Sequence, residues 1–286
     1  MQSLRKLTIA IPTFNRYTDL RITLGAIKKQ LSKLDYKIAS LIHIHVQDND
    51  SNDNTSKYLI NSPIASDIKK TGALFTYKKN SMNLGFDKNF ALCIDNSLSE
   101  YTWIFSDDDI IYEDVIEKVL IILKDNISMV NLLMEQIPFC SKEKPLRIDS
   151  YSEKYLSGKS FEALMSFSKL SVFIFNTEIA KKILANLDPT MFIHIELALG
   201  IALDSKIKCL YSNLFIGEDN IHFTNKTNDW SPYIFNNRYL MVKRLLNDFR
   251  RDDLISILDF KFKNITDPIV ITLKLLIFKN LDMHNV

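Results

Sequence analysis

The chain has few glycines and cysteines, and their scarcity excludes several classes of protein. Six of its 286 residues are glycine and three are cysteine. No G-x-G-x-x-G motif follows the first predicted strand, and G-x-x-x-x-G-K-[ST] does not occur, so neither a Rossmann dinucleotide site nor a P-loop is supported. Cys93, Cys140 and Cys209 lack the paired spacing of metal or redox motifs, which favours a reduced, cytoplasmic chain.

Long apolar runs and a strong charge imbalance are missing as well. No segment reaches the roughly 20 apolar residues that a membrane-spanning helix needs. The apolar run at residues 7–11 ends at Pro12 and is too short for a signal peptide. The net charge is +2 and no basic block is interleaved with aromatic residues, so we expect no nucleic-acid partner.

Short apolar runs alternate with helical patterns along the first half of the chain. Strands are predicted at residues 7–11, 41–46, 74–77 and 101–105, with helices between them at 19–31, 55–60 and 87–96. This alternation predicts an α/β fold with a mostly parallel central sheet flanked by helices. Ligands of such sheets bind outside the carboxyl ends of the strands, and polar segments follow each of these strands. We therefore expect the site at that edge.

Three adjacent carboxylates, Asp107, Asp108 and Asp109, follow the apolar run at 101–105. Like charges at the mouth of a buried strand repel one another, and a cation offsets that cost. Hard oxygen ligands suit Mg²⁺ or Mn²⁺ held against a substrate's phosphates. The cluster predicts a divalent-metal site, and the alternative is an acidic turn that caps the helix predicted to begin near Glu113.

Four polar segments, each at the end of a strand, together resemble glycosyltransferase family 2, an inverting family with the GT-A nucleotide-binding fold. They are residues 9–16 (IAIPTFNR), 47–55 (QDNDSNDNT), 83–85 (NLG) and 106–109 (SDDD). The resemblance extends over about residues 7–216. The variant looks most like bacterial enzymes that build capsule, O-antigen or other surface polysaccharides.

The resemblance implies a nucleotide-diphosphate sugar as donor and a divalent metal, Mn²⁺ or Mg²⁺, as cofactor. It assigns the nucleotide to residues at the strand ends: Pro12, Thr13, Asn15, Asp48, Asn83, Gly85 and Asp107. Asp48 would accept a hydrogen bond from the base, because a carboxylate is a pure acceptor. Asp107 would lie nearest the ribose, and Asp108 or Asp109 would bind the metal.

An inverting transfer also needs a carboxylate that deprotonates the acceptor hydroxyl. The resemblance puts this base at the start of a helix in the second half, where this chain has His194 and Glu196 instead of the usual acidic pair. Glu196 is the predicted base, and His194 competes because histidine accepts a proton near neutral pH. Glu218 and Asp219, expected in a loop after the strand at 207–216, are a further candidate.

The predicted organisation is a GT-A domain at residues 1–222 and a helical extension at 223–286. Within the domain, residues 1–110 would bind the nucleotide and 111–222 the acceptor, with His222 as a further candidate metal ligand. The extension mixes basic and apolar residues, which suits peripheral contact with the inner face of the cytoplasmic membrane, near a lipid-linked acceptor. A helical cap on the domain and a dimer contact are the alternatives.

Three hypotheses about function follow from these observations. The leading one is a metal-dependent inverting glycosyltransferase that extends a glycan. The second is a catalytically impaired GT-A-like scaffold, because the usual acidic pair is absent at residues 194–196. The third is a sugar nucleotidyltransferase, which usually carries a glycine-rich loop after its first strand, whereas residues 12–16 contain no glycine.

Overall fold

The computed structural model describes residues 5–123, 127–135, 150–161, 169–187, 192–204, 206, 208–219 and 232–263. The chain divides into two compact units, Met1–Ile221 and His222–Val286. The first unit holds the sheet, and the described residues of the second, 232–263, form two helices. The further division of the first unit into a nucleotide half and an acceptor half stays a prediction.

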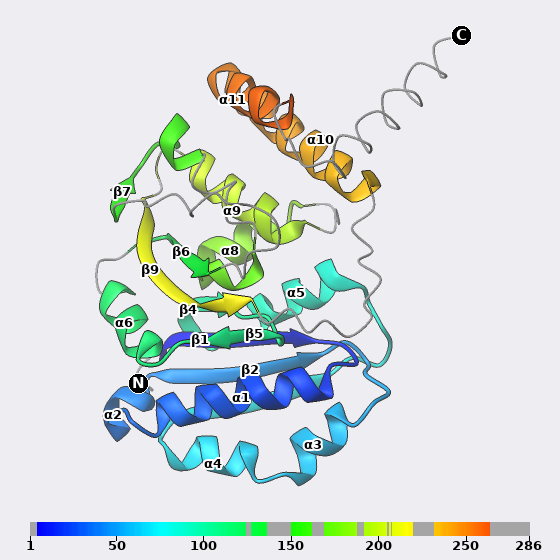
Figure 1. Cartoon of the computed structure of the whole chain (residues 1–286), viewed down its shortest axis with the longest axis vertical. Helices are drawn as coiled ribbons and strands as arrows, with labels where there is room; N and C mark the ends of the chain where they lie inside the picture. The colour runs from blue at the N-terminus through cyan, green and yellow to red at the C-terminus, as the bar shows by residue number, and fades with distance from the viewer. Residues whose placement is uncertain are drawn as a thin grey trace. The chain divides into compact units, whose positions relative to one another are not determined.

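The first unit is built on a nine-stranded sheet with the order β3-β2-β1-β4-β8-β6-β9-β5, and β7 pairs with β9 (Figure 1). Its strands are β1 (Arg5–Thr13), β2 (Ile42–Asp48), β3 (Leu74–Lys79), β4 (Ser99–Ile104), β5 (Asp109–Ile111), β6 (Met129–Glu135), β7 (Tyr151–Glu153), β8 (Phe173–Asn176) and β9 (Cys209–Asp219). The α/β class is confirmed.

The two halves of the sheet differ in strand direction. Strands β3, β2, β1 and β4 run parallel to one another. In the other half only β6 and β9 pair in parallel, and the pairs β4–β8, β6–β8, β5–β9 and β7–β9 are antiparallel. The parallel arrangement therefore belongs to the half that carries the polar strand ends, where helices connect successive strands.

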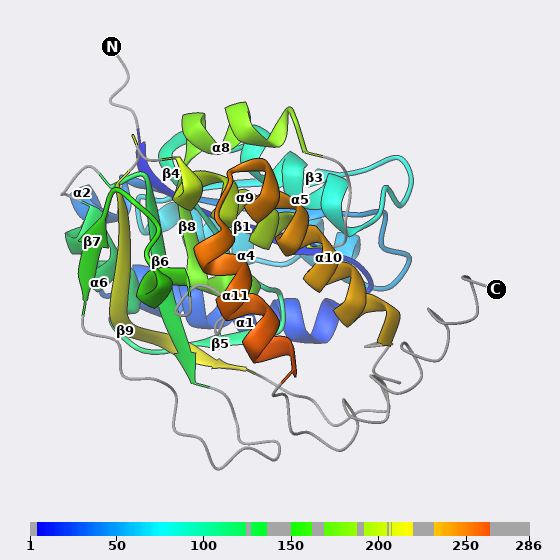
Figure 2. The ribbon, with the colours of Figure 1, turned by 90° about the horizontal axis from the view of Figure 1, so that it is seen from above.

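Helices cover both faces of the sheet. In the first unit they are α1 (Tyr17–Leu31), α2 (Tyr36–Ala39), α3 (Thr55–Asn61), α4 (Ile64–Lys70), α5 (Phe86–Asp95), α6 (Val115–Ile122), α8 (Thr177–Leu184) and α9 (Ile193–Leu203), with a 3₁₀ turn η2 (Leu170–Val172). Helices α1, α3 and α4 lie on one face, and α5 and α8 on the other (Figures 1 and 2).

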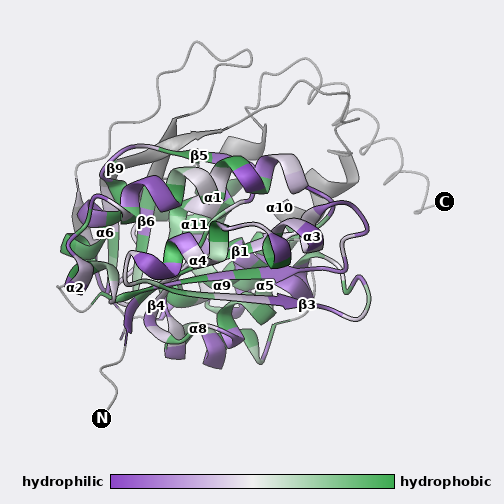
Figure 3. Ribbon diagram, turned by 90° about the horizontal axis from the view of Figure 1, so that it is seen from below, coloured by the Kyte–Doolittle hydropathy of each residue, from purple (hydrophilic) through white to green (hydrophobic). Residues whose placement is uncertain are grey.

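Helix α1 shows how the sequence pattern specifies this packing. Its buried residues Leu20, Leu24, Ile27 and Leu31 recur every three or four positions and form one apolar stripe. Hydrophilic and hydrophobic residues alternate along α1 and α4 in Figure 3, as expected for helices with one face on a sheet. Packing of this apolar stripe on the sheet holds α1 in place. Arg16, which directly precedes α1, therefore lies at the carboxyl end of β1.

The pair Glu218–Asp219 lies in a strand, where the sequence predicted a loop. Strand β9 continues to Asp219, and its end pairs with the short strand β5, with Asp109 opposite Asp219 and Ile110 opposite Glu218. The sequence pattern missed β5 because three residues after an acidic run carry too little alternation to predict a strand. The added pairing brings the backbone of Asp219 next to the acidic triplet.

The second unit contains α10 (Pro232–Asp248) and α11 (Asp252–Lys263), which agrees with the predicted helical extension. The two helices pack against each other. Lys243 pairs with Asp259, and the guanidinium of Arg251, which is buried, pairs with Asp253. Within the described residues, none of the helices has the length and apolarity that a membrane span requires.

Candidate functional site

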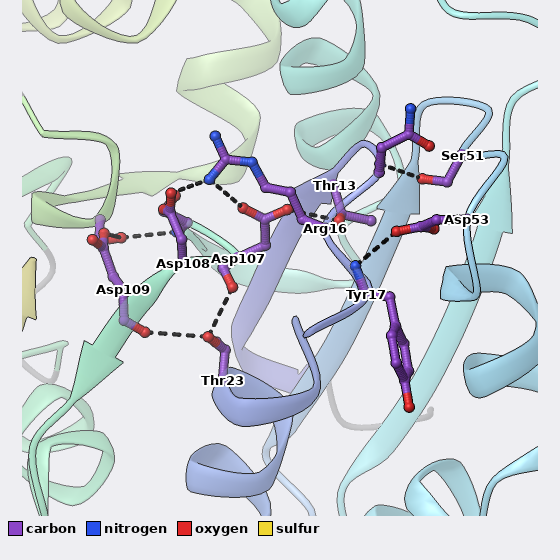
Figure 4. Close-up of polar contacts among 12 residues, drawn as sticks. Thr13, Arg16, Tyr17, Thr23, Ser51, Asp53, Asp107, Asp108 and Asp109 are labelled. Carbon is purple, nitrogen blue, oxygen red and sulfur yellow. Dashed lines mark hydrogen bonds and ion pairs between the residues drawn. The ribbon is translucent and has the colours of Figure 1, made fainter. Parts of the chain in front are cut away.

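The carboxyl ends of β1, β2 and β4 meet at one edge of the sheet. Thr13 is the register partner of Asp48, and Ala10 is that of Ile104, so the segments that follow these strands are neighbours. Figure 4 shows the loop after β1 beside the acidic triplet. The sequence predicted this juxtaposition because a polar segment follows each strand of the predicted parallel sheet.

Asp107 is bound to the end of β1. Its Oδ2 accepts a hydrogen bond of 2.7 Å from the Thr13 hydroxyl, and its carbonyl oxygen accepts one of 3.0 Å from Thr23 of α1. The residue is 4% exposed. Burial raises the pKa of Asp107 to about 7, against the effects of Arg16 and Thr13, which favour the charged form.

The other two aspartates differ in exposure. The Asp108 side chain is 24% exposed, and its Oδ1 accepts a hydrogen bond from the Ser106 hydroxyl. Asp109 is buried, and its Oδ2 accepts a hydrogen bond from Ser171 of η2. Asp108 is thus the carboxylate of the triplet that solvent reaches most easily, whereas Asp109 joins the two halves of the sheet.

Arg16 supplies the positive charge at this cluster. Its Nη1 forms an ion pair with Asp108 Oδ2 and lies 3.6 Å from Asp107 Oδ1 (Figure 4). Arg16 belongs to the segment 9–16, but no role was predicted for it from the sequence. A basic residue directly after a strand-end loop, with a carboxylate cluster predicted at the same edge, was the available signal.

Asp48 is completely buried at the end of β2. Its Oδ1 accepts a hydrogen bond of 2.8 Å from the Ser51 amide, and its Oδ2 accepts bonds from the hydroxyls of Tyr77 (2.9 Å) and Ser56 (3.2 Å). Burial raises the pKa of Tyr77 to about 12, so this hydroxyl stays protonated and donates its hydrogen bond to Asp48.

The loop after β1 is tied to the loop after β2. Asn15 has a φ of 54°, a left-handed conformation that asparagine tolerates better than most residues. Its amide donates to the Ser51 hydroxyl, and its Oδ1 accepts from the Asn52 amide. Pro12, which is buried in β1, pairs in register with Gln47.

Asn49 holds the segment from Asn83 to Gly85. Its Nδ2 donates to Asn83 Oδ1 at 2.7 Å and to the Gly85 carbonyl at 3.3 Å, and its Oδ1 accepts from the Leu84 amide at 2.9 Å. Gly85 has a φ of +81°, which favours glycine, and it directly precedes α5. The sequence analysis proposed Asn83 and Gly85 but missed Asn49, which fixes both.

The two candidate bases lie in the first turn of α9, and both are buried. Glu196 is 1% exposed and His194 is 8% exposed. The His194 ring is surrounded by four phenylalanine rings with centroids 5.9 to 6.5 Å away, those of Phe86, Phe90, Phe173 and Phe192. Phe86 begins α5 immediately after Gly85, so the start of α9 lies near the strand-end loops. His222 lies outside the described residues.

The acidic residues fit a metal that is shared with a substrate. In the described part of the chain, no group of three His, Cys, Asp or Glu side chains is placed to hold an ion by itself. Mg²⁺-type sites typically use one or two carboxylates and complete the shell with substrate phosphates and water. Asp108 is half-buried and already forms an ion pair with the Arg16 guanidinium, so it suits a site in which the protein supplies only some of the metal ligands.

A parallel half-sheet with polar strand ends, joined to a mixed second half, is the GT-A fold of nucleotide-sugar transferases. S. aureus TarS has a TM-score of 0.64 at 13% identity, covering 92% of this chain and 44% of TarS. The mannosyltransferase PcManGT from Pyrobaculum calidifontis, in complex with GDP-Man and Mn²⁺, has a TM-score of 0.61 at 12% identity, covering 94% of this chain and 72% of the other. These likenesses confirm the predicted fold.

The model of Glycosyl transferase family 2 matches residues 8–182, so the chain belongs to this family. The resemblance stated from the four motifs is confirmed. A curated relative, abequosyltransferase RfbV of Salmonella typhimurium (strain LT2), is 32% identical over 110 residues. That match covers 38% of this chain and 29% of the relative, so the chain spans under a third of that protein in the alignment.

Proposed function

We propose that this chain transfers a sugar from a nucleoside diphosphate donor to a hydroxyl of a growing bacterial surface glycan, with inversion and with a divalent metal. The observation that carries the proposal is the meeting of Asp107, Asp108 and Arg16 with the loops after β1 and β2 at one sheet edge. The donor class is supported by the GT-A neighbours, among them a TarS structure in complex with UDP-GlcNAc at a TM-score of 0.59.

The donor's nucleotide is proposed to bind across the strand ends, against the backbone of Thr13 and Asn15 and the segment from Asn83 to Gly85. Asp48 lies at the same strand ends, where it accepts hydrogen bonds from the Ser51 amide and from the hydroxyls of Ser56 and Tyr77. We propose that the base N–H takes the place of one of these hydroxyls at Asp48, because the carboxylate can only accept.

Asp107 and Asp108 are proposed to orient the donor's ribose and diphosphate. Asp108 is the proposed metal ligand, and Asp109, through Ser171, keeps the triplet in place from the second half of the sheet. A bound divalent ion would offset the charge that grows on the leaving diphosphate. Arg16 adds a fixed positive charge on the same side.

Glu196 is proposed as the base that removes the proton of the acceptor hydroxyl. It is the carboxylate in the first turn of α9, whose neighbour His194 packs on Phe86 beside the nucleotide loops. We propose that His194, enclosed by phenylalanine rings, orients the start of α9 rather than exchanging protons. The acceptor is proposed to be a lipid-linked glycan at the inner face of the membrane. The name of the Salmonella relative, an abequosyltransferase, supports sugar transfer as the reaction.

The products of donor cleavage test this proposal against its alternatives. With UDP-, GDP-, dTDP- or CDP-sugars and Mn²⁺, we expect one donor to release free nucleoside diphosphate and no pyrophosphate. Asp108→Asn should lower that rate by about 100-fold or more, because it removes charge that stabilises the transition state. Asp95→Asn, at an exposed position of α5, is the matched control. Pyrophosphate release would indicate a nucleotidyltransferase, and failure to cleave any donor would favour the scaffold.

A further inference from the structure

Arg16 is held at the acidic cluster by the backbone on both sides of it. It lies between Asn15, whose amide and side chain are bound to the loop after β2, and Tyr17, the first residue of α1. The Tyr17 amide donates to Asp53 at 2.9 Å, and the Arg16 carbonyl accepts from the Leu20 amide at 3.0 Å. These contacts hold the backbone of Arg16 in place, and its guanidinium extends to the carboxylates of Asp107 and Asp108.

The two carboxylates divide their oxygens in the same way. In each, one oxygen accepts from a hydroxyl, that of Thr13 for Asp107 Oδ2 and that of Ser106 for Asp108 Oδ1. The other oxygen, Asp107 Oδ1 or Asp108 Oδ2, faces the guanidinium of Arg16. A metal ion held by Asp108 would lie close to the same guanidinium.

A guanidinium and a divalent ion cannot share these oxygens without strong repulsion, because two positive charges a few ångströms apart repel each other near a protein surface. The Arg16 side chain is 33% exposed, so it lies on the solvent side of Asp107, whose side chain is 6% exposed. Arginine always carries its charge, so a pH change does not remove the positive charge from these carboxylates. The charge leaves them only when the Arg16 side chain moves away.

We propose that Arg16 competes with the divalent cation for Asp107 and Asp108, and that the donor's diphosphate relieves this competition by offering the guanidinium another anion. Metal and nucleotide binding are then coupled through one side chain. The inference rests on the proposed function and adds that Arg16 makes the metal bind after, or together with, the donor. Arg16 is a positioning residue in this scheme, acting through Asp108.

Binding of Mn²⁺ alone tests the competition, with free Mn²⁺ measured by its electron paramagnetic resonance signal. Relative to the parent chain, Arg16→Gln should bind Mn²⁺ about tenfold more tightly, in the range of typical coupling effects. Arg21→Gln, at an exposed position of α1, should bind like the parent. Arg16→Lys keeps a positive charge and should remain close to the parent. Equal or weaker Mn²⁺ binding by Arg16→Gln would overturn the proposal.

The coupling is tested by repeating the titrations with UDP, GDP, dTDP and CDP, corrected for Mn²⁺ bound to nucleotide in protein-free samples. A nucleotide should tighten Mn²⁺ binding more in the parent than in Arg16→Gln, and equal tightening in both would contradict the role of Arg16. If the Arg16→Gln variant folds only when Mn²⁺ is present, the competition is supported. If Mn²⁺ raises the melting temperature of Arg16→Gln no more than that of the parent chain, the competition is refuted.

A failure of the metal site itself gives a different result. Asp108→Asn should abolish Mn²⁺ binding in both the parent and the Arg16→Gln background. If Mn²⁺ binding is unaffected by Asp108→Asn, the proposed metal site is wrong. If Asp108→Asn removes binding and Arg16→Gln does not strengthen it, the site stands and the competition alone fails.

Discussion

The guanidinium of Arg16 lies between two neighbouring carboxylates in this protein and offsets part of their negative charge. Without Arg16, the repulsion between Asp107 and Asp108 at this strand end would carry a higher electrostatic cost. The ion pair thus keeps the cluster formed before any substrate arrives. At the scale of residues, the site is defined by how each oxygen of these carboxylates is used.

The role of Glu196 can be tested with a change that preserves its size. We expect Glu196→Gln to reduce sugar transfer by roughly 100- to 10,000-fold, the usual contribution of a general base, and to leave donor binding unchanged. Transfer is measured with a competent acceptor, and donor binding by the thermal shift that the nucleotide sugar produces. Glu178→Gln, on the exposed side of α8, should behave like the parent.

His194→Asn separates the two residues of α9. Because four aromatic rings surround His194, we expect this change mainly to lower the melting temperature. If transfer in Glu196→Gln stays near the parent level while a folded His194→Asn protein loses it, the assignment of the base to Glu196 is wrong and His194 takes its place.

A line of buried polar side chains extends across β2 toward the site. His43 and His45 both contact the Thr76 hydroxyl, at 2.7 and 2.8 Å, and His45 contacts Gln47 at 3.1 Å. Gln47 Nε2 donates to Asn80, whose Nδ2 donates to Asn49. At the scale of elements, this line joins the interior of the sheet to the segment that begins α5.

Removing the Asn49 side chain should loosen that segment. Asn49→Ala leaves the Leu84 amide and the Asn83 side chain without their present partner, so we expect a loss of roughly 1–3 kcal/mol in the free energy of unfolding. Weaker donor binding should accompany it. Urea unfolding and donor titration measure the two effects. Asn61→Ala, exposed at the end of α3, should change stability by less than about 0.5 kcal/mol.

The two histidines make stability depend on pH. Burial lowers the pKa of His43 to about 3 and that of His45 to about 4, below the 6.5 of an unfolded chain. As the pH falls below 6.5, the unfolded chain takes up protons that the folded chain does not, so stability is lost. Between about pH 7 and pH 5 we expect each histidine to reduce it by about 2 kcal/mol.

Comparison with a double variant, His43→Gln with His45→Gln, isolates this effect in urea unfolding at the two pH values. Asp107, with its raised pKa, acts in the opposite direction but is present in both proteins, so its contribution cancels. A parent chain that loses no more stability than the double variant would show that the histidines are not responsible.

The sequence predicted the elements near the site better than those far along the chain. Alternation of apolar residues and the polar ends of β1, β2 and β4 were enough to bring Thr13, Asp48 and Asp107 to one edge. The sequence pattern could not show that Ser171 would contact Asp109, because these residues are 62 positions apart. The pairing of β5 with β9 was missed for the same reason, because Asp109 and its register partner Asp219 lie still farther apart in the sequence.

At the scale of the whole molecule, the chain consists of a GT-A unit and a separate pair of helices. Within the second unit, Lys243 and Arg251 pair with acidic partners, and apolar residues of both helices are buried: Met241, Val242, Leu245, Leu246, Leu254 and Leu258. This packing is that of a folded helical hairpin. The exposed residues of these helices include Arg244 and Arg250.

We propose that Asp108, with Asp107 beside it, binds an activated sugar's diphosphate through a divalent cation. The most direct measurement is the melting temperature of the parent chain and of Asp108→Asn with nucleoside diphosphates, with and without Mn²⁺, since a ligand that binds only the folded state raises it. We predict that at least one nucleotide stabilises the parent only when Mn²⁺ is present, and that Asp108→Asn abolishes this effect. Equal stabilisation of both proteins, or none of the parent by any nucleotide, would contradict the account.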